Sequence, residues 1–536
     1  MAQTEPTFSL SSDRVDVYDF AEITICLHTA VEDPFQAVEV LGKFNETEVS
    51  GFCDSQDGNI HRIRFMPTEA GEYSYSVTMR YGETEATHEG KLTAHDAGHR
   101  GMLRVDEAHP FHLIWSGTGE HFFWNGTTCY MMAGLSEERM ETALERLSNL
   151  GINRVRVALC PSRQKDGGRW FEEAVQPRED FTFCYSPWLC ARPESLTDPG
   201  WDTTRFDVAF WQKYERLLTK ARSLGIIVQV IFVMDAQEDQ NYPFDREKTG
   251  DDANEHRYYR YGIARLGAFS NVEWCLTNEW HLFRPDEWAD AIGAFVEEID
   301  PYDHLTSVHG TGRFPFSTSP WADVALFQSW DESGGYDFML KKRQEQAASG
   351  RPIPQINEEY GYEDHYPTGW GGARVAPARS ADNRRRLAWE ITMAGAYQTT
   401  GESAANGVGG WINGLGDETM TMLHGYRYAK AFFESFPWWK LEPIAGEQRA
   451  SLPVPEDAKV LHGDGVATVV YLPQGGTVGA AVAAAMPEAV ARWYNPRNGE
   501  WHNITANGGE EFVSPTTGED DWALLITAPR QDDAAA

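Results

Sequence analysis

Hydrophobic and polar side chains alternate over short runs in the first hundred residues. The alternating runs lie at 22–26, 60–65 and 73–79. Between the last two, the segment 66–73 holds Pro67 and Gly71, which is typical of a turn between antiparallel strands. Short strands at this spacing are typical of a β-sandwich, and the pattern therefore predicts one over residues 1–98.

From residue 99 onward, short apolar runs alternate with longer segments of helical spacing. The run at 225–233 is almost continuously apolar, which is typical of a strand buried on both faces of a parallel sheet. The first predicted strand starts at Phe122, and the other seven lie at 152–159, 225–233, 272–276, 305–309, 324–328, 353–359 and 405–411. The predicted helices lie at 136–149, 210–224, 255–269, 285–298, 336–348, 382–399 and 424–436. Eight alternating units predict a (β/α)8 barrel over residues 99–440.

Strand patterning returns beyond Pro437. Runs typical of strands lie at 465–472, 491–494 and 521–526. They predict a small antiparallel β-sandwich over residues 441–536. The whole chain is thus predicted to be an α/β protein whose barrel is flanked by a β-domain at each end.

Composition and net charge limit the classes of molecule that the protein is expected to bind. The chain has 536 residues, with 46 basic against 81 acidic side chains and a formal net charge of −35. This charge disfavours nucleic acid and anionic membrane surfaces, and no apolar run is long enough to predict a membrane span. The 19 Trp and 21 Tyr either fill cores or offer flat faces to sugar rings, and composition alone does not choose.

The predictions of cellular location and of cofactors rest on motifs that the sequence lacks. The first twenty residues show no basic start followed by an apolar run, so we expect a cytoplasmic protein, although a secreted chain trimmed of its signal would look the same. The seven cysteines are dispersed, which argues against a disulfide framework and a zinc site. No HExxH motif or phosphate-binding glycine loop occurs, so neither metal nor cofactor is predicted. The sequence leaves open whether the chain forms a homo-oligomer.

Carboxyl side chains follow two of the predicted barrel strands. The fourth strand ends at Asn278 and Glu279, and the seventh ends at Glu359. Functional side chains of such barrels lie at the carboxyl ends of the strands, so we expect both carboxyls to converge on one cavity. Cleavage of a glycosidic bond needs such a pair, one protonated and one ionised. Either carboxyl could instead cap a helix or pair with an arginine.

Glu358 adjoins Glu359 and could compete with it. Alternation along a strand sends neighbouring side chains to opposite faces, so only one of the two is expected in the cavity. The Tyr360-Gly361 pair that follows favours Glu359. We therefore expect Glu358 to face the helices or a neighbouring loop.

The motifs around the two carboxyls resemble those of a known group of enzymes. Asn278-Glu279 and Glu359-Tyr360-Gly361 resemble the signature of clan A glycoside hydrolases. This resemblance implies a retaining mechanism with Glu279 as acid/base and Glu359 as nucleophile. Residues 151–156 resemble the second-strand motif of cellulase-like families, which implies that Arg156 lies beside the nucleophile and holds it ionised. The alternative for Arg156 is an ion pair at the barrel floor.

Further matches extend the resemblance along the chain. Residues 119–128 resemble the first strand of apiosidase-like barrels, and residues 359–363 fit their Glu-x-x-Tyr-Glu pattern. The amino-terminal sandwich resembles a domain of unknown function that often precedes such barrels. Residues 493–499 and 520–522 resemble a small sandwich that carries a collagen-binding label in the same proteins. We infer no collagen binding from that label.

Other polar and aromatic residues near the predicted strand ends are candidates for substrate binding. Asn278 can bond a sugar hydroxyl beside the cleaved bond, and in related barrels a Trp after strand eight often floors the sugar subsite. A core or capping role is an equally weighted alternative for most of these residues. The further candidates are Asp235 after strand three, His309 after strand five, Gln328 and Trp330 after strand six, Tyr362 after strand seven and Trp411 at the end of strand eight.

The sequence as a whole predicts a retaining glycoside hydrolase that acts on an oligo- or polysaccharide. The long loop between residues 160 and 207 is expected to close one end of the cleft, which would make the enzyme exo-acting. The alternatives are a non-catalytic carbohydrate-binding protein on a degenerate barrel and a transglycosylase that uses the same residues. The sugar, its linkage and its anomer are not specified by these motifs.

Overall fold

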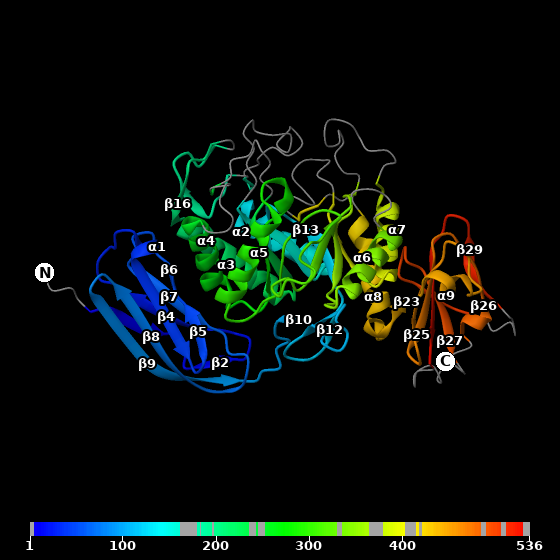
Figure 1. Cartoon of the computed structure of the whole chain (residues 1–536), viewed down its shortest axis with the longest axis horizontal. Coiled ribbons are helices and arrows are strands. Elements are labelled where there is room, and N and C mark those ends of the chain that lie inside the picture. The colour runs from blue at the N-terminus through cyan, green and yellow to red at the C-terminus, as the bar shows by residue number, and fades with distance from the viewer. Residues whose placement is uncertain are drawn as a thin grey trace.

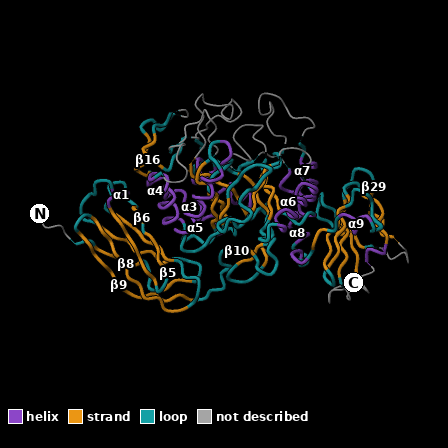
Figure 2. The backbone as a smooth tube through the Cα atoms, in the orientation of Figure 1, coloured by secondary structure: helices purple, strands orange, loops and turns teal. Residues whose placement is uncertain are grey.

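The structure is a computed structural model, and it describes residues 5–160, 180–182, 184–195, 198–234, 243–244, 252–329, 335–363, 379–402, 414–416, 421–483, 489–504 and 511–528. Three bodies follow one another along the long axis of the molecule (Figure 1). Helices surround the strands of the middle body, whereas the outer bodies consist mainly of strands and loops (Figure 2). This arrangement confirms a barrel with β-rich domains at both ends.

The amino-terminal body is a sandwich of a four-stranded and a five-stranded sheet. Its alternating strands send one face inward, where the rings of Phe44 and Phe65 from the two sheets stack with centroids 4.3 Å apart. The first sheet holds β1 (Thr7–Leu10), β3 (Ala21–Cys26), β7 (Ile60–Phe65) and β6 (Phe52–Cys53), and the second holds β2 (Arg14–Asp16), β9 (Thr84–His95), β8 (Gly71–Tyr81), β4 (Val38–Phe44) and β5 (Thr47–Ser50), with α1 (Pro34–Ala37) between β3 and β4.

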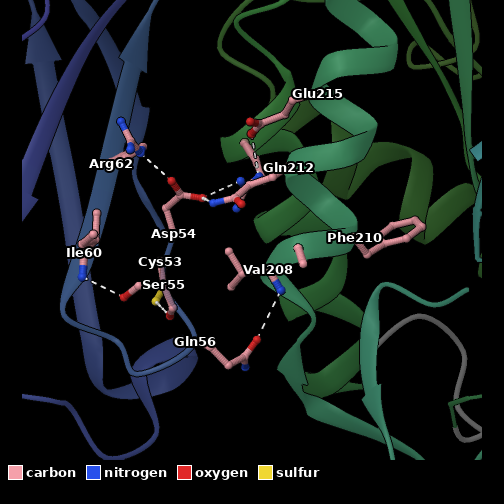
Figure 3. A network of polar contacts seen from close by, with 12 residues as sticks. Cys53, Asp54, Ser55, Gln56, Ile60, Arg62, Val208, Phe210, Gln212 and Glu215 are labelled. Carbon is pink, nitrogen blue, oxygen red and sulfur yellow. Dashed lines mark hydrogen bonds and ion pairs between the residues drawn. The ribbon is translucent and has the colours of Figure 1, made fainter. Parts of the chain in front are cut away.

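The sandwich is attached to the barrel by a polar network (Figure 3). The Asp54 carboxylate accepts a hydrogen bond from Gln212 on α3 (Val208–Ser223) at 3.1 Å, and it pairs with Arg265 on α4 (Ala253–Leu266) at 2.5 Å. Further contacts join Gln56 to the backbone of Val208 and Arg64 to Glu215. Because Asp54 and Arg265 are buried and paired, the sandwich occupies a fixed position on the outer face of the barrel.

The middle body is built on an eight-stranded parallel sheet. In sheet order its strands are β19 (Thr306–Ser307), β18 (Val272–Cys275), β17 (Ile227–Val233), β14 (Arg154–Cys160), β13 (Asn125–Thr128), β22 (Tyr397–Thr400), β21 (Gln355–Glu359) and β20 (Ala325–Gln328). The two end strands are joined as well, because Asp323 N donates to Thr306 O at 2.9 Å and Ser307 Oγ donates to Val324 O at 2.6 Å. The sheet therefore closes into the predicted barrel.

Helices cover the outside of the barrel between successive strands. In α2 (Glu137–Asn149), α3 and α5 (Asp286–Ile299) the buried residues recur at helical spacing, so these helices present an apolar stripe to the sheet. The side chain of Asp207 caps α3 by accepting from Ala209 N and Phe210 N. Besides α3 and α4, the helices are α2, α5, α6 (Tyr336–Ala348), α7 (Ala381–Met393) and α8 (Met422–Phe433).

The eighth strand lies earlier in the chain than the sequence pattern predicted. The prediction placed it at 405–411 after a helix that ran through Thr399, but the strand is Tyr397–Thr400 and α7 ends at Met393. Gly395 follows that helix with φ 72°, a conformation that ends helices and that glycine adopts without strain. The end of α7 was not predicted, because the apolar pattern of the helix continues past Met393.

A small sheet lies at the amino-terminal end of the barrel. It consists of the antiparallel strands β10 (Leu103–Val105), β11 (Leu113–Trp115) and β12 (His121–Phe122), and the chain passes from β12 into the first barrel strand (Figure 1). The aromatic side chain of Phe123 between them stacks on Phe433 of α8. This sheet therefore covers the end of the barrel opposite to the carboxyl ends of its strands.

The carboxy-terminal body packs beside α7 and α8. Arg385 of α7 donates to the buried Asp521 carboxylate at 2.8 Å, which fixes the contact. Its strands are β23 (Glu442–Pro443), β24 (Lys459–Gly463), β25 (Ala467–Leu472), β30 (Trp522–Thr527), β27 (Val490–Tyr494) and β28 (Trp501–Asn503) in one sheet and β26 (Gly475–Gly479) and β29 (Glu511–Thr517) in another, with α9 (Gly446–Ala450) after β23. Among the helices that the structure describes, none has the length and apolarity of a membrane span.

Candidate active site

Buried charges fill the interior of the barrel. Arg154 and Arg156 alternate along β14 with apolar residues that face the helices, so both guanidinium groups point inward. Arg154 donates to Glu273 at 2.7 Å and to Glu358 at 2.5 Å, and its guanidinium lies 4.2 Å from the ring of Trp124. Such charges are stable inside a protein only when they are paired, and here the pairs tie the strands β14, β18 and β21 together.

A β-bulge changes the direction of the seventh strand at its last two residues. The paired residues of β20 and β21 are Phe327 with Asn357 and Gln328 with Glu359. Glu358 is therefore an extra residue, and the usual alternation is lost at this point. Its carboxylate lies 3.0 Å from Arg156 Nε, and that of Glu359 lies 3.6 Å from Arg156 Nη1. The prediction that Glu358 faces the helices is wrong, because the bulge brings both carboxyls to the same guanidinium.

Glu359 is buried among polar side chains. Tyr130, two residues beyond β13, donates its hydroxyl to Glu359 Oε2 at 3.0 Å, and Arg156 Nη1 donates to that hydroxyl at 2.8 Å. The hydroxyl of Tyr362 also bonds Glu359 and lies 3.5 Å from that of Tyr130. Two hydroxyl donors thus hold this carboxyl, and Arg156 lies 3.6 Å from it, as expected for a group whose position matters for function.

The electrostatics of Glu359 reflect two opposing effects. Burial raises the pKa of its carboxyl above the ordinary value, whereas the charge of Arg156 and the hydroxyls of Tyr362 and Tyr130 lower it, and the net direction is upward. The pKa of Tyr130 is raised well above its ordinary value, mainly by burial, so its hydroxyl stays protonated at neutral pH. Tyr130 therefore remains a hydrogen-bond donor throughout the neutral range.

Glu279 is positioned by a sharp turn after the fourth strand. β18 ends at Cys275, and the next residues are tied to β17 because Thr277 Oγ1 and Asn278 N both donate to Val233 O. Glu279 then adopts φ 50° and ψ 50°, a left-handed conformation that costs free energy for a residue with a side chain. The turn leaves the Glu279 side chain partly exposed at the rim of the barrel.

The tight packing of Trp280 holds this turn. Trp280 begins a short 3-10 helix (Trp280–Leu282), and its indole is fully buried. A Cβ atom on Gly310 would lie 1.7 Å from the indole, so this position after the fifth strand accepts only glycine. Packing between the fourth and fifth strands thus stabilises the strained conformation of Glu279.

The structure brings the predicted residues of strands two, four and seven together. Arg156 Nη2 donates to Asn278 Oδ1 at 2.7 Å, so one guanidinium links the end of the fourth strand to Glu359. The negative charges of Glu359 and Glu279 both contribute to the raised pKa of Tyr130. The predicted convergence of the two carboxyls on one cavity stays a prediction.

His309 lies beside Glu359, beyond the fifth strand. Its Nε2 is 3.7 Å from Glu359 Oε2, and among the described residues neither ring nitrogen has a hydrogen-bond partner. Its pKa is lowered well below the ordinary value, first by burial and then by the charges of Arg156, His281 and Arg154. A neutral, buried imidazole with its polar atoms unused is suited to contact a polar ligand.

The remaining candidates have different outcomes. Gln328 is the last residue of β20 and is partly exposed at the rim, so it stays a candidate for substrate contact. Asp235, Trp330 and Trp411 lie outside the described residues. Because the eighth strand is Tyr397–Thr400, the prediction that Trp411 ends that strand is wrong.

The sequence analysis did not predict the contact of Tyr130 with Glu359, and it gave Glu363 no role beyond its place in a motif. Tyr130 was missed because it follows the first strand by two residues, past the motif that identified that strand. Glu363, the last residue of the Glu-x-x-Tyr-Glu pattern, accepts from the backbone N of Thr421 and Met422 at 3.0 and 3.1 Å. It caps α8, and it thereby ties the loop that carries Tyr362 to that helix.

A parallel eight-stranded barrel that presents carboxyls from its fourth and seventh strands at one end has the architecture of a glycoside hydrolase. Residues 112–440, more than half of the chain, match the family model described as "Apiosidase-like, catalytic domain". The chain belongs to the apiosidase-like family. Residues 14–80 match the domain of unknown function DUF5060, and residues 456–527 match the model described as "Putative collagen-binding domain of a collagenase".

Solved structures resemble the whole chain and not only its barrel. A protein described as a putative glycoside hydrolase from Bacteroides vulgatus ATCC 8482 matches with a TM-score of 0.75 at 21% identity, over 96% of this chain and 100% of its own. A glycoside hydrolase family 5 protein from the same organism matches with a TM-score of 0.58 at 17% identity, over 80% of this chain and 93% of its own. At these identities the likeness establishes the fold. No curated protein matches the chain by sequence.

Proposed function

We propose that the protein is a retaining glycoside hydrolase with Glu359 as nucleophile and Glu279 as acid/base. The observation that carries this proposal is that Arg156 links the ends of strands four and seven, because it donates to Asn278, the residue before Glu279, and lies 3.6 Å from Glu359. Carboxyls on strand ends that are linked in this way lie at the same mouth of the barrel, where they can reach one anomeric carbon. Retaining enzymes hold such carboxyls about 5–5.5 Å apart.

The reaction follows from the two roles. In the first step, Glu279 donates its proton to the leaving oxygen while Glu359 attacks the anomeric carbon and forms a glycosyl ester. In the second step, ionised Glu279 takes a proton from water, which attacks the same carbon and releases the Glu359 carboxylate. Each step inverts the carbon, so the product keeps the configuration of the substrate.

The neighbouring residues support binding of the sugar that is cleaved. Because Asn278 Oδ1 accepts from Arg156, its amide nitrogen is the group oriented to donate to a sugar hydroxyl. His309 offers a neutral imidazole beside Glu359. Arg156 and Tyr130 hold the nucleophile in place and favour its ionised form.

We also propose that the enzyme attacks an oligo- or polysaccharide from one end. The support is the long connection between β14 and α3, because loops of this length usually shape the cleft of a barrel. A hairpin of β15 (Trp188–Cys190) and β16 (Trp201–Phe206) lies within it, and Trp188 is fully buried. Release of one small product from a long oligosaccharide would support this mode, and fragments of many lengths would contradict it.

Stereochemistry tests the proposed mechanism directly. A panel of aryl glycosides, covering pentosides and hexosides of both anomers, should contain a substrate for the purified chain. The first sugar released, followed by proton NMR before mutarotation, is expected to have the anomeric configuration of the substrate. A first product of opposite configuration would contradict the ester intermediate, because a single displacement inverts the carbon.

Removing the Tyr130 hydroxyl is expected to change the pH profile. The hydroxyl lowers the pKa of Glu359, so Tyr130→Phe raises that pKa further. The nucleophile acts ionised, and activity is lost as the pH falls through its pKa. The acid limb of kcat/KM is therefore expected to move to higher pH, with a loss of about tenfold at the optimum.

The control for this experiment is Tyr428→Phe. Tyr428 lies on α8, where it packs against Gly499 of the carboxy-terminal domain, and its change is expected to leave the pH profile in place. An unchanged acid limb in Tyr130→Phe would show that the hydroxyl does not act on the ionisation of the nucleophile.

A further inference from the structure

Two histidines and an aspartate converge at the end of the barrel opposite to the candidate active site. Asp106 follows β10, His109 lies in the turn to β11, and His121 is the first residue of β12. Asp106 Oδ2 lies 2.9 Å from His109 Nδ1 and 2.8 Å from His121 Nε2. One oxygen and two ring nitrogens thus lie within 4.8 Å of one another.

The spacing of these three atoms is close to that of a metal site. Zinc binds imidazole nitrogen and carboxylate oxygen at about 2.0–2.2 Å, so neighbouring ligand atoms of a tetrahedral site lie about 3.3 Å apart. The observed separations from the oxygen need to grow by only about half an ångström to admit an ion at this spacing. Each imidazole presents a lone pair when its proton resides on the other ring nitrogen.

The three side chains are held in place by their surroundings. The other oxygen of Asp106 accepts from Ala108 N at 2.9 Å, and the turn is closed by the bond from Asp106 N to His112 O. The ring of His121 stacks on Trp439 with centroids 3.8 Å apart and planes within 7°. A site whose ligands are already oriented loses little conformational entropy when it binds an ion.

The cluster is also open to small molecules. His109 and His121 line a cleft of about 910 Å³ at the amino-terminal end of the barrel, together with Trp115, Trp438 and Trp439. The His109 side chain is 32% exposed, whereas those of His121 and Asp106 are 13% and 10% exposed. Three protein ligands beside a cleft leave the fourth position of a tetrahedral ion to water or to a small ligand.

We propose that Asp106, His109 and His121 bind a divalent transition-metal ion, with Zn²⁺ as the ion that fits this donor set. Two imidazoles and one carboxylate favour such ions over Mg²⁺ or Ca²⁺, which prefer oxygen ligands. The ion joins the turn after β10 to the first residue of β12. It therefore clamps the small sheet through which the chain enters the first barrel strand (Figure 1).

Metal retention tests the proposal without any assay of glycoside cleavage. The full chain, free of any histidine tag, is treated with chelator, dialysed against roughly micromolar Zn²⁺, and its zinc is measured by mass spectrometry. The wild type is expected to retain about one Zn²⁺ per chain. His109→Ala and His121→Ala are expected to bind at least about tenfold more weakly.

Two further variants make the test specific. His462→Ala removes another imidazole that lies beside a carboxylate, 2.9 Å from Asp464 on the carboxy-terminal domain, and it should retain zinc like the wild type. Asp106→Asn keeps the size and the acceptor oxygen of the side chain but is a poor ligand, so it should lose zinc while its circular dichroism in chelator stays that of the wild type. Zn²⁺ should raise the unfolding temperature of the wild type and of His462→Ala only.

The opposite results would overturn the proposal. If the wild type retains no zinc, or if folded Asp106→Asn and His121→Ala retain as much as the wild type, the cluster is an aspartate that accepts two histidine hydrogen bonds and nothing more. These outcomes are independent of the glycosidase proposal, because zinc retention and unfolding temperature do not involve Glu279 or Glu359.

Discussion

Replacement of Glu359 by glutamine is expected to lower kcat/KM by about 10,000-fold or more and to leave the protein folded. An amide cannot form the glycosyl ester, so both steps of the double displacement are lost. Glutamine keeps the size of the side chain and an oxygen that can accept from Tyr130. The scaffold should tolerate the change because Glu358, and not Glu359, makes the shorter contact with Arg156.

The measurement combines kinetics on an aryl glycoside with thermal unfolding. Glu345→Gln is the matched control, because Glu345 lies on the exposed side of α6, where it pairs with Lys342, and its change should leave kcat/KM within a factor of about two. Activity of Glu359→Gln within tenfold of the wild type would refute the nucleophile assignment. A large fall in unfolding temperature would instead indicate that Glu359 serves the scaffold.

Replacement of Glu279 by alanine is expected to affect the two steps unequally. With a poor leaving group, the loss of the proton donor should slow the first step by about 100- to 10,000-fold. With a dinitrophenyl leaving group, which departs without protonation, the first step should proceed and the ester on Glu359 should accumulate. The pre-steady-state burst of dinitrophenol measures this difference.

Azide distinguishes the roles of the two carboxyls. In Glu279→Ala, azide can attack the accumulated ester without a general base, so it should restore turnover and give a glycosyl azide of retained configuration. In Glu359→Ala, any azide product must arise by a single displacement and should have the opposite configuration. Identical stereochemistry from the two variants would contradict the assignment of distinct roles.

The sequence predicted the barrel well where local patterns are strong. α6 lies at 336–348 as predicted, because its ends coincide with turn residues, and β17 lies within the apolar run 225–233. The amphipathic spacing of α2 and α3 was equally informative. These elements are specified by periodicity within one window of sequence, which is the signal that pattern analysis measures.

The sequence analysis failed where contacts between distant parts of the chain determine the local structure. The eighth strand was displaced because the apolar pattern continues past Gly395, whose positive φ ends α7. Glu358 was assigned to the wrong face because a bulge is visible only in the pairing of two strands that are separated in sequence. The cluster of Asp106, His109 and His121 follows no metal-binding motif, since its third member comes from a different strand of a small sheet.

The sequence predicted several residues of the candidate site but not the contacts between them. Arg156, Asn278 and Glu359 were recognised from motifs at strand ends, and the structure joins them through one guanidinium. Tyr130 was not recognised, because its role depends on a loop from the first strand reaching the seventh. Motifs identify residue types at positions, whereas the contacts between strands set the electrostatics.

The bulge in the seventh strand places the adjacent residues Glu358 and Glu359 in different environments. Glu358 is fully buried and paired with two arginines, so the barrel depends on it, whereas the adjacent Glu359 is the residue that we propose as nucleophile. On the proposed assignment, one substitution at Glu359 would remove the nucleophile and leave the ion pairs of Glu358 with Arg154 and Arg156 intact. On this proposal, such a variant would be a folded carbohydrate-binding protein without catalytic activity.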